Sequence, residues 1–171
     1  MKCFLVKLFL SLLVCLLLTG CEIGFFPYYN TPKEAYLAEP YHSHVENIYF
    51  DTVNAEIDCI ELNEENAIWF AVVNDTYVIE SFMKKKDGKY RVGKLTSIYD
   101  FTDADIADTG SAETISFSHY PLSSDQTAYW ALVLTETLSE LDQEHQYTVK
   151  GYTVSLNGQD TDLTLVYYMG E

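Results

Sequence analysis

The stretch Ala67-Ile68-Trp69-Phe70-Ala71-Val72-Val73 is a run of seven apolar residues without a charge. A half-buried strand alternates apolar and polar residues, whereas a strand covered on both faces is apolar throughout. The run is short for a buried helix and rich in β-branched and aromatic residues, which favour strands. It therefore predicts a central strand with packing on both faces. The run Ala128–Leu134 has the same character and predicts a second central strand.

Outward from these runs, short apolar segments alternate with polar turns from Val45 onward. Asp87-Gly88 and Asn157-Gly158 are the strongest hairpin signals, because both central residues of a type I′ turn need positive φ. Charged strands are expected at sheet edges, and Tyr77–Lys84 with its lysine-rich end is the clearest example. The predicted strands are Val45–Phe50, Glu56–Leu62, Ala67–Val73, Tyr77–Lys84, Lys89–Leu95, Thr114–Tyr120, Ala128–Thr135, Tyr147–Leu156 and Asp162–Met169.

A single short helix is expected before the strands. Thr31-Pro32-Lys33-Glu34 has the residues of a capping box, with Thr31 as N-cap and Pro32 at the first helical position. Pro40 limits the helix to about two turns, and we expect it to cover one end of the sheet. The predicted fold is mainly β: an antiparallel, sandwich-like domain of about nine strands with one short N-terminal helix.

The order of strand, Trp-containing strand, Tyr-led strand, tight turn and strand occurs twice, in residues 45–100 and again in 112–169. This order is consistent with two repeated four-stranded units. The alignment needs an insertion of about nine residues in the second half, and unrelated β meanders align equally loosely. True duplication and accidental likeness therefore both stay open.

The first 21 residues have the layout of an export signal. Lys2 and Lys7 precede and interrupt an apolar segment, Phe4–Leu18, which is followed by Leu18-Thr19-Gly20-Cys21. This ending resembles the lipobox of bacterial lipoproteins. The resemblance implies cleavage between Gly20 and Cys21, a diacylglycerol on the sulfur of Cys21, and acylation of the new amine. Two or more acyl chains hold a protein on a membrane that it does not span. An ordinary secretory signal with an incidental cysteine is the alternative.

This reading divides the chain into a signal peptide, 1–20, a lipidated cysteine and tether, 21–31, and a single mainly-β domain, 32–171. The tether contains an aromatic cluster, which we expect at the membrane interface rather than folded back on the domain: Phe25, Phe26, Tyr28 and Tyr29. The expected location is the extracytoplasmic face of the cell membrane, in an envelope of the Gram-positive kind. The sequence of the folded domain resembles no family that carries an activity with it.

Net charge and cysteine content limit the classes of function that the chain can have. Removing residues 1–20 takes away two lysines and no acid, so the formal charge changes from −16 to −18. Such a surface repels nucleic acid phosphates and anionic headgroups, which excludes nucleic acid binding. Cys59 is the only thiol left after the signal and Cys21, so no disulfide can form within the mature chain. Cys59 lies between Ile57 and Ile60 and is expected to be a buried, unreactive thiol.

No cofactor or catalytic constellation is indicated. One acidic loop offers alternating oxygen ligands of the kind that Ca²⁺ binds, but it lacks the glycine and the terminal glutamate of an EF-hand, so a solvated linker is favoured over a weak Ca²⁺ site: Asp100, Asp103, Asp105 and Asp108. The four histidines do not complete a tetrahedral ligand set, and no nucleophile motif or phosphate-binding loop occurs. The sequence therefore argues against an enzyme.

The remaining signal is aromatic, with fourteen Tyr and two Trp in the chain. Tyrosine provides rigid, amphipathic contact area, as protein-binding surfaces use. The leading hypothesis is a lipid-anchored, non-catalytic lipoprotein that binds an envelope protein or peptide through tyrosines near element ends: Tyr36, Tyr41, Tyr120, Tyr167 and Tyr168. The alternative is a carbohydrate- or solute-binding lipoprotein, which requires Trp69 or Trp130 in an open cleft. A cell-wall hydrolase is the least favoured reading.

Overall fold

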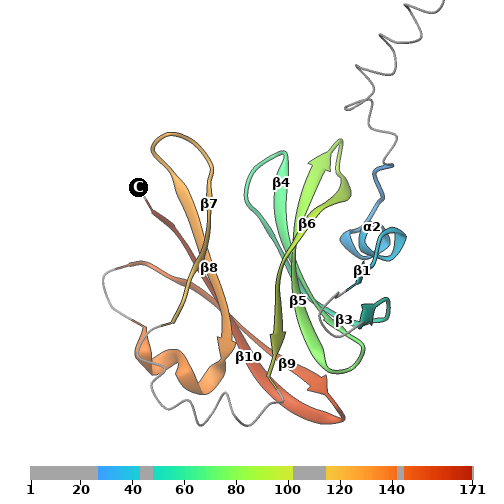
Figure 1. Ribbon diagram of the computed structural model, residues 1–171. Helices are drawn as coiled ribbons and strands as arrows, with labels where there is room; N and C mark the ends of the chain where they lie inside the picture. Colours follow the sequence, from blue (N-terminus) through green and yellow to red (C-terminus); the bar gives the residue numbers. More distant parts are fainter. Residues whose placement is uncertain (1–26, 43–47, 102–114, 142–144, 171) are drawn as a thin grey trace, which may run out of the picture.

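The computed structural model describes residues 27–42, 48–101, 115–141 and 145–170. These residues form two four-stranded antiparallel sheets packed face to face, with a short helix outside the first sheet (Figure 1). The first sheet has the order β3-β4-β5-β6, the second β7-β8-β10-β9, and β1 pairs with β2. The elements are α2 (Pro32–Ala38), β1 (Tyr41–His42), β2 (Tyr49–Phe50), β3 (Val53–Glu61), β4 (Asn66–Val73), β5 (Tyr77–Lys86), β6 (Lys89–Asp100), β7 (Ser118–Pro121), β8 (Thr127–Leu134), the 3₁₀ helix η1 (Thr135–Glu140), β9 (Thr148–Leu156) and β10 (Gln159–Gly170).

β4 is buried at every residue, which confirms the two-sided central strand predicted from its sequence. Successive side chains of a strand point to opposite faces, so β4 contributes to two apolar layers. On one face the side chains join the core between the two sheets: Ile68, Phe70 and Val72. On the other face they join an outer core under α2 and β2: Ala67, Trp69, Ala71 and Val73.

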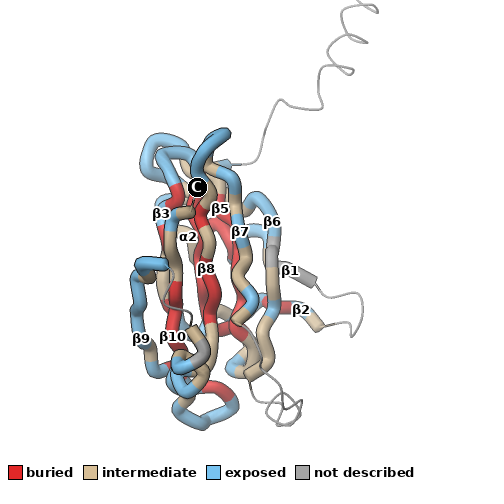
Figure 2. Tube along the Cα trace, turned by 90° about the vertical axis from the view of Figure 1, so that its left-hand side faces the viewer, coloured by how far each residue is buried: buried red, intermediate tan, exposed pale blue. Residues whose placement is uncertain are grey.

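β8 is the matching central strand of the second sheet and lies between β7 and β10. Its inward residues Ala128, Trp130 and Leu132 are buried in the inter-sheet core. Its outward face is covered less completely, because Tyr129 and Val133 are only half-buried. Figure 2 shows the buried positions along β8 and β10, whereas β9 at the sheet edge is exposed along most of its length.

The predicted helix forms with the predicted cap. The side chain of Thr31 accepts a hydrogen bond from the backbone N–H of Glu34, and the Glu34 carboxylate accepts one from the backbone N–H of Thr31. We expected the helix to cover one end of the sheet. It lies instead against the outer face of the first sheet. Tyr36 is the reason: its ring packs 5.5 Å from that of Trp69, and its hydroxyl donates to the carbonyl of Phe50 at 2.7 Å.

Both predicted hairpin turns are confirmed by positive φ at their two central residues: Asp87 and Gly88 in one, Asn157 and Gly158 in the other. A third turn, between β4 and β5, also has two residues with positive φ, Asn74 and Asp75. This third turn contacts the Asn157-Gly158 turn of the second sheet, since the N–H of Asn157 donates to the carbonyl of Asp75 at 2.6 Å. This contact links the first sheet to the second.

One expectation about the sheets is wrong, and the duplication that the sequence left open is not supported by the strand order. β5 is not an edge strand, because it lies between β4 and β6 with Glu80 and Ser81 buried, and its lysines extend beyond the packed region. The two halves also differ in strand order. In the first sheet the Trp-containing strand pairs with the Tyr-led strand that follows it. In the second, β8 pairs instead with the last strand, β10. The two four-stranded units therefore share a chain order without sharing a topology.

A glycine pair isolates the contribution of turn geometry to stability. Gly158 has φ +77°, Gly151 has no positive φ, and an added Cβ meets nothing within 4 Å at either position. We expect Gly158→Ala to lower the free energy of unfolding by about 1 kcal/mol, because a Cβ disfavours the left-handed conformation. Gly151→Ala, on β9, should leave it unchanged or raise it slightly. Urea unfolding of the two variants is the test, and equal stabilities would contradict the assignment of the turn.

Candidate binding sites

The five tyrosines predicted to form one binding surface do not come together. Tyr36 is buried at 1 % exposure in the outer core. Tyr120 and Tyr167 are half-buried against the inter-sheet core, whereas Tyr168, the next residue on β10, faces outward. Tyr41 forms part of β1, but its side chain lies outside the described residues. The prediction that these tyrosines form one surface is therefore wrong. Tyr168 alone is taken further below, because it lies on the outward face of the second sheet.

Tyr168 belongs to an aromatic cluster on the outward face of the second sheet. We call this the outer aromatic cluster, and its members are Phe117, His119, Tyr129, His145, Tyr147 and Tyr168. The two histidines are exposed and the other four side chains are half-buried. None of the six carries a carboxylate or an ammonium group. The cluster therefore forms an aromatic surface on a domain that is otherwise strongly acidic.

Strand register builds this cluster. His119, Tyr129 and Tyr168 lie directly opposite one another across β7, β8 and β10. Tyr129 and Tyr168 stack with ring centroids 4.8 Å apart and planes 7° apart. His145 lies 4.4 Å from the ring of Tyr168, and Tyr147 meets the same ring edge-on at 5.3 Å. Cross-strand aromatic pairs of this kind stabilise a sheet and also leave a flat row of rings at its surface.

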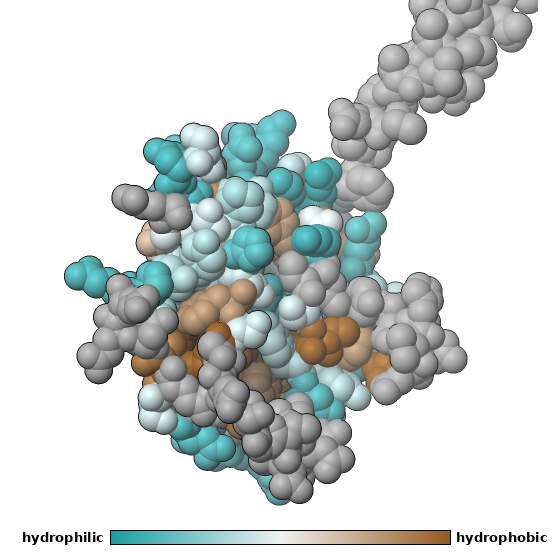
Figure 3. Space-filling model, turned by 60° about the vertical axis from the view of Figure 1, so that its left-hand side comes forward, coloured by the Kyte–Doolittle hydropathy of each residue, from teal (hydrophilic) through white to brown (hydrophobic). Residues whose placement is uncertain are grey.

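Two valines continue this face: Val166, which is fully buried, and Val149, which is exposed. Leu165 points into the inter-sheet core, so its neighbour Val166 points outward, and Val149 lies opposite Val166 on β9. Val149 is 50 % exposed. Seen from the side of the second sheet, apolar side chains interrupt an otherwise hydrophilic surface beside the segments drawn in grey (Figure 3).

A second candidate site is a cavity of about 230 Å³ where the β6 edge of the first sheet faces the β7 edge of the second. Aromatic and polar side chains share its lining: Glu80, Phe82, Lys94, Ser97, Ser118, His119, Tyr120 and Trp130. The pairing of β5 with β6 shifts register twice beside the cavity, at Glu80/Ser81 and at Phe82/Met83. Such bulges bend a strand and redirect its side chains.

Glu80 is the unusual residue of this cavity, because it is a carboxylate at 0 % exposure on the inward face of β5. Its Oε2 accepts a hydrogen bond of 2.7 Å from the hydroxyl of Tyr99. Burial, followed by the charge of Glu80 and this hydrogen bond, raises the pKa of Tyr99 well above its usual range. The hydroxyl therefore remains a donor at any physiological pH. Trp130 lines the same cavity, and its indole N–H has no hydrogen-bond partner among the described residues.

The tryptophans do not form the open platform that carbohydrate binding by stacking requires. Trp69 is 1 % exposed and Trp130 is 3 % exposed. Trp69 is held in the outer core, where its indole N–H donates to Glu56 at 3.1 Å. The condition that the carbohydrate- or solute-binding alternative sets, an exposed Trp in an open cleft, is therefore not met.

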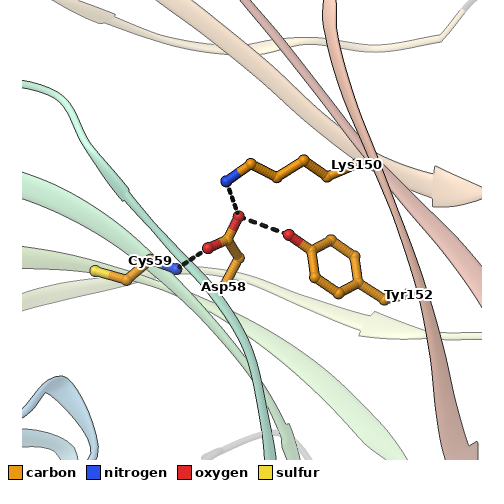
Figure 4. A network of polar contacts seen from close by, with 4 residues as sticks. All are labelled: Asp58, Cys59, Lys150 and Tyr152. Atoms are coloured by element: carbon orange, nitrogen blue, oxygen red, sulfur yellow. Dashed lines mark hydrogen bonds and ion pairs between the residues drawn. The ribbon is translucent and has the colours of Figure 1, made fainter.

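A polar network closes the opposite edge of the sandwich, where β3 faces β9 (Figure 4). Asp58 accepts hydrogen bonds from the ammonium of Lys150 at 2.7 Å, the hydroxyl of Tyr152 at 2.6 Å and the backbone N–H of Cys59 at 2.8 Å. Burial raises the pKa of Asp58, but the hydrogen bonds from these groups and the charge of Lys150 outweigh it, and the net pKa lies below the usual 3.8. The network joins the two sheets, because Asp58 on β3 accepts from Lys150 and Tyr152 on β9.

Cys59 is half-buried and has its pKa raised to about 12, first by burial and then by the charges of Glu61 and Asp58. A thiol of this kind stays protonated at neutral pH, which agrees with the unreactive cysteine expected from the sequence. Of the proposed Ca²⁺ ligands, Asp100 ends β6, and Asp103, Asp105 and Asp108 lie outside the described residues. Among the residues that the structure describes, no group of three or more side chains is arranged to hold a metal ion.

The tyrosines of the predicted tether pack on the domain rather than projecting from it. Tyr29 and Tyr90 form an antiparallel bridge with two backbone hydrogen bonds of 2.7 Å. The guanidinium of Arg91 lies 5.2 Å from the ring of Tyr28. The expectation of a membrane-interface position is therefore wrong for these two residues, and Phe25 and Phe26 lie outside the described residues. No helix in the described part of the chain is long and apolar enough to cross a bilayer.

Asp58→Asn tests the edge network through pH. A carboxylate with a lowered pKa stabilises the fold above its ordinary value of 3.8, and this stability is lost as the pH falls through the folded-state pKa. We expect the variant to lose about 1–2 kcal/mol of unfolding free energy at neutral pH, a value reduced by the partial exposure of the pair. Urea unfolding should show the difference shrinking below pH 3.8. A difference independent of pH would contradict an ionised Asp58.

Comparisons of the chain with protein-family models, with curated proteins and with solved structures found no match. Function is therefore argued from the geometry of the described residues and from the N-terminal sequence.

Proposed function

We propose that the chain is an exported lipoprotein, held on the extracytoplasmic face of the cell membrane through Cys21, whose domain binds an envelope protein without catalysis. The observation that carries the binding function is the row of rings formed by His119, Tyr129 and Tyr168 across three strands. The lipobox resemblance at Leu18–Cys21 carries the location.

The chemistry of the outer aromatic cluster favours a polypeptide partner. Tyrosine rings supply apolar contact area, and their hydroxyls together with the two imidazoles supply hydrogen-bonding groups that match a peptide backbone. The six residues of the cluster include no carboxylate and no ammonium group, so binding to them desolvates neither. Side chains already packed against each other lose little conformational entropy on binding. These properties are typical of the centre of a protein interface.

Charge gives the partner a second property. The mature chain has a formal charge of −18, and Glu136 lies in η1 beside the second sheet. Complementary charge accelerates association and excludes partners of the same sign. The partner segment is therefore expected to be neutral or basic around an apolar centre.

Cys21→Ser tests the anchoring part of the proposal. Without the thiol no diacylglycerol can be attached, and one acyl chain or none does not hold a protein durably on a bilayer. We expect the parent protein to sediment with membranes and to partition into detergent, and the variant to leave the membrane fraction. Retention of the variant in the membrane fraction, with the detergent partitioning of the parent, would contradict lipidation at Cys21.

Exchange of the exposed edge of the cluster tests the binding part. The double variant His145→Ala/Tyr147→Ser changes two residues that lie outside the strands, so the sheet pairing is retained. We expect at least a tenfold loss in recovery of a crosslinked envelope protein, because the interface loses the two rings that pack against Tyr168. The measurement is crosslinking in intact envelopes, followed by identification of the captured chain and a binding assay with that purified chain.

Tyr49→Ser is the matched control, because Tyr49 is 47 % exposed on β2, outside the first sheet. It should capture the same partner as the parent. Loss of capture in Tyr49→Ser and not in the double variant would overturn the assignment of the binding face. Thermal unfolding of both variants checks that each is folded. Recovery of a second copy of this chain alone would replace the proposed partner with self-association.

A further inference from the structure

The basic residues of the chain are concentrated in one hairpin. Of the eight lysines and arginines that follow Cys21, six lie from Lys84 to Lys94, together with a single acid, Asp87. Six cations and one aspartate give this segment a formal charge of +5, within a mature chain of −18. Net charge alone predicts repulsion from anionic headgroups. It does not describe this hairpin, because charges farther away than about 8 Å are largely screened at physiological salt.

Strand register places four of these cations on one face of the β5–β6 hairpin. Lys84 lies directly opposite Arg91, and Lys86 lies directly opposite Lys89. Residues two apart along a strand share a face, so both pairs point the same way. We call these four residues the basic face. Like charges directly opposite each other destabilise a sheet, and within the described part of the chain none of the four forms an ion pair with a carboxylate.

The two members of the basic face farther from the turn are held by uncharged groups. Lys84 donates to the amide oxygen of Asn66 at 2.8 Å. The guanidinium of Arg91 lies 5.2 Å from the ring of Tyr28. These contacts position the two cations without neutralising them. The other two members, next to the turn, are exposed.

Acidic side chains near the hairpin offset only part of this charge. Lys85 points to the opposite face of β5, where its ammonium pairs with Glu61 at 2.6 Å. Glu64 and Glu65, from the turn between β3 and β4, share an open hollow with the lysines of β5. The two members of the basic face that lie on β6 do not line this hollow. They therefore remain available to an anionic surface.

The chain enters the domain beside this hairpin. The two backbone hydrogen bonds between Tyr29 and Tyr90 put the entering chain next to Lys89 and Arg91. The β5–β6 turn and the first described residues lie at the same end of the first sheet (Figure 1). Eight Cα–Cα steps lead from Cys21 to Tyr29 and span about 28 Å when fully extended. A bilayer that holds Cys21 is therefore within reach of the basic face.

We propose that the basic face docks on the anionic lipid headgroups of the membrane that carries the anchor. The inference rests on the lipid anchor of the proposed function and adds an orientation of the domain to it. The ammonium and guanidinium groups, and not the rings of the tether, contact the lipid phosphates. Each lysine or arginine near an anionic surface strengthens binding about fivefold. The anchor adds a high local concentration, so a small cationic face is sufficient on an acidic domain.

Docking by this face determines which end of the sandwich points away from the membrane. The β4–β5 turn lies at the other end of β5, and Asp75 of that turn contacts Asn157 of the β9–β10 turn. β5 has ten residues, so the two ends are about 30 Å apart. The outward face of the second sheet, with the outer aromatic cluster, then stands beside the membrane and stays accessible to a protein partner.

Paramagnetic lipids test this orientation. The lipidated mature protein, with ¹⁵N-labelled glycine, is placed in nanodiscs that contain a gadolinium-chelating lipid, which broadens the signals of nearby amides. Gly88 reports on the docked turn and Gly158 on the far turn, and Gly88→Asn and Gly158→Ala identify the two signals. The tether alone holds Gly88 nearer the bilayer. We expect the excess broadening of Gly88 over Gly158 to increase severalfold when phosphatidylglycerol is added to phosphatidylcholine discs, and to fall again at high salt.

Two double variants separate charge from shape. Lys86→Gln/Lys89→Gln removes the two exposed charges and leaves the turn residues in place. In anionic discs it should show only the excess broadening that the parent shows in phosphatidylcholine alone. Lys86→Arg/Lys89→Arg keeps the charges and should behave as the parent does. Both variants should stay on the discs, because the acyl chains hold them there.

The outcomes distinguish failure of the docking from failure of the anchor. An excess broadening of Gly88 that does not depend on anionic lipid, or that persists in Lys86→Gln/Lys89→Gln, would overturn the docking and leave the anchor intact. Absence of broadening at both glycines in every disc would overturn the anchor and the docking together. Crosslinking of Lys89 to an acidic envelope protein, with no effect of lipid charge, would assign the basic face to a protein instead.

Discussion

Two-sided burial of β4 is the constraint on which the rest of the fold depends. Alternate side chains of one strand enter two separate apolar layers, so a slip of one residue in register would send Trp69 into the inter-sheet core and Phe70 out of it. Both layers must therefore be supplied by other parts of the chain. The second sheet covers one face, and α2 with β2 covers the other, joined by the hydrogen bond from Tyr36 to Phe50.

Much of this architecture could be predicted because it follows from local patterns. The apolar run of β4, the capping box at Thr31 and the two glycine turns each depend on neighbours in sequence. Pairing between distant strands has no such local signal. The second half of the sequence repeats the strand order of the first, yet β9 lies on the far side of β10 from β8. Only tertiary packing distinguishes this arrangement from a simple meander.

The candidate sites were less predictable for the same reason. The lysine-rich end of Tyr77–Lys84 made β5 look like an edge strand, whereas the strand lies inside the sheet with Glu80 and Ser81 buried. Tyr36 looked exposed because it stands in a short helix with a small apolar face, and its burial depends on Trp69 and Phe50. The outer aromatic cluster joins rings from four separate segments, and strand register aligns only His119, Tyr129 and Tyr168 among them. The alternation of Tyr167 and Tyr168 was the one local clue that adjacent tyrosines serve different faces.

The bridge between Tyr29 and Tyr90 holds the chain on the domain from this point, so it shortens the segment between Cys21 and the domain. If Cys21 carries the lipid, five residues lie between the anchor and Pro27, and the six Cα–Cα steps span about 20 Å when fully extended. The domain then stays close to the bilayer surface and does not reach the outer part of the envelope. Encounters with another membrane-held molecule become two-dimensional, with a high local concentration, while molecules farther out are beyond reach. With such an anchor, the Tyr29–Tyr90 backbone pair would limit the domain to partners that lie close to the bilayer.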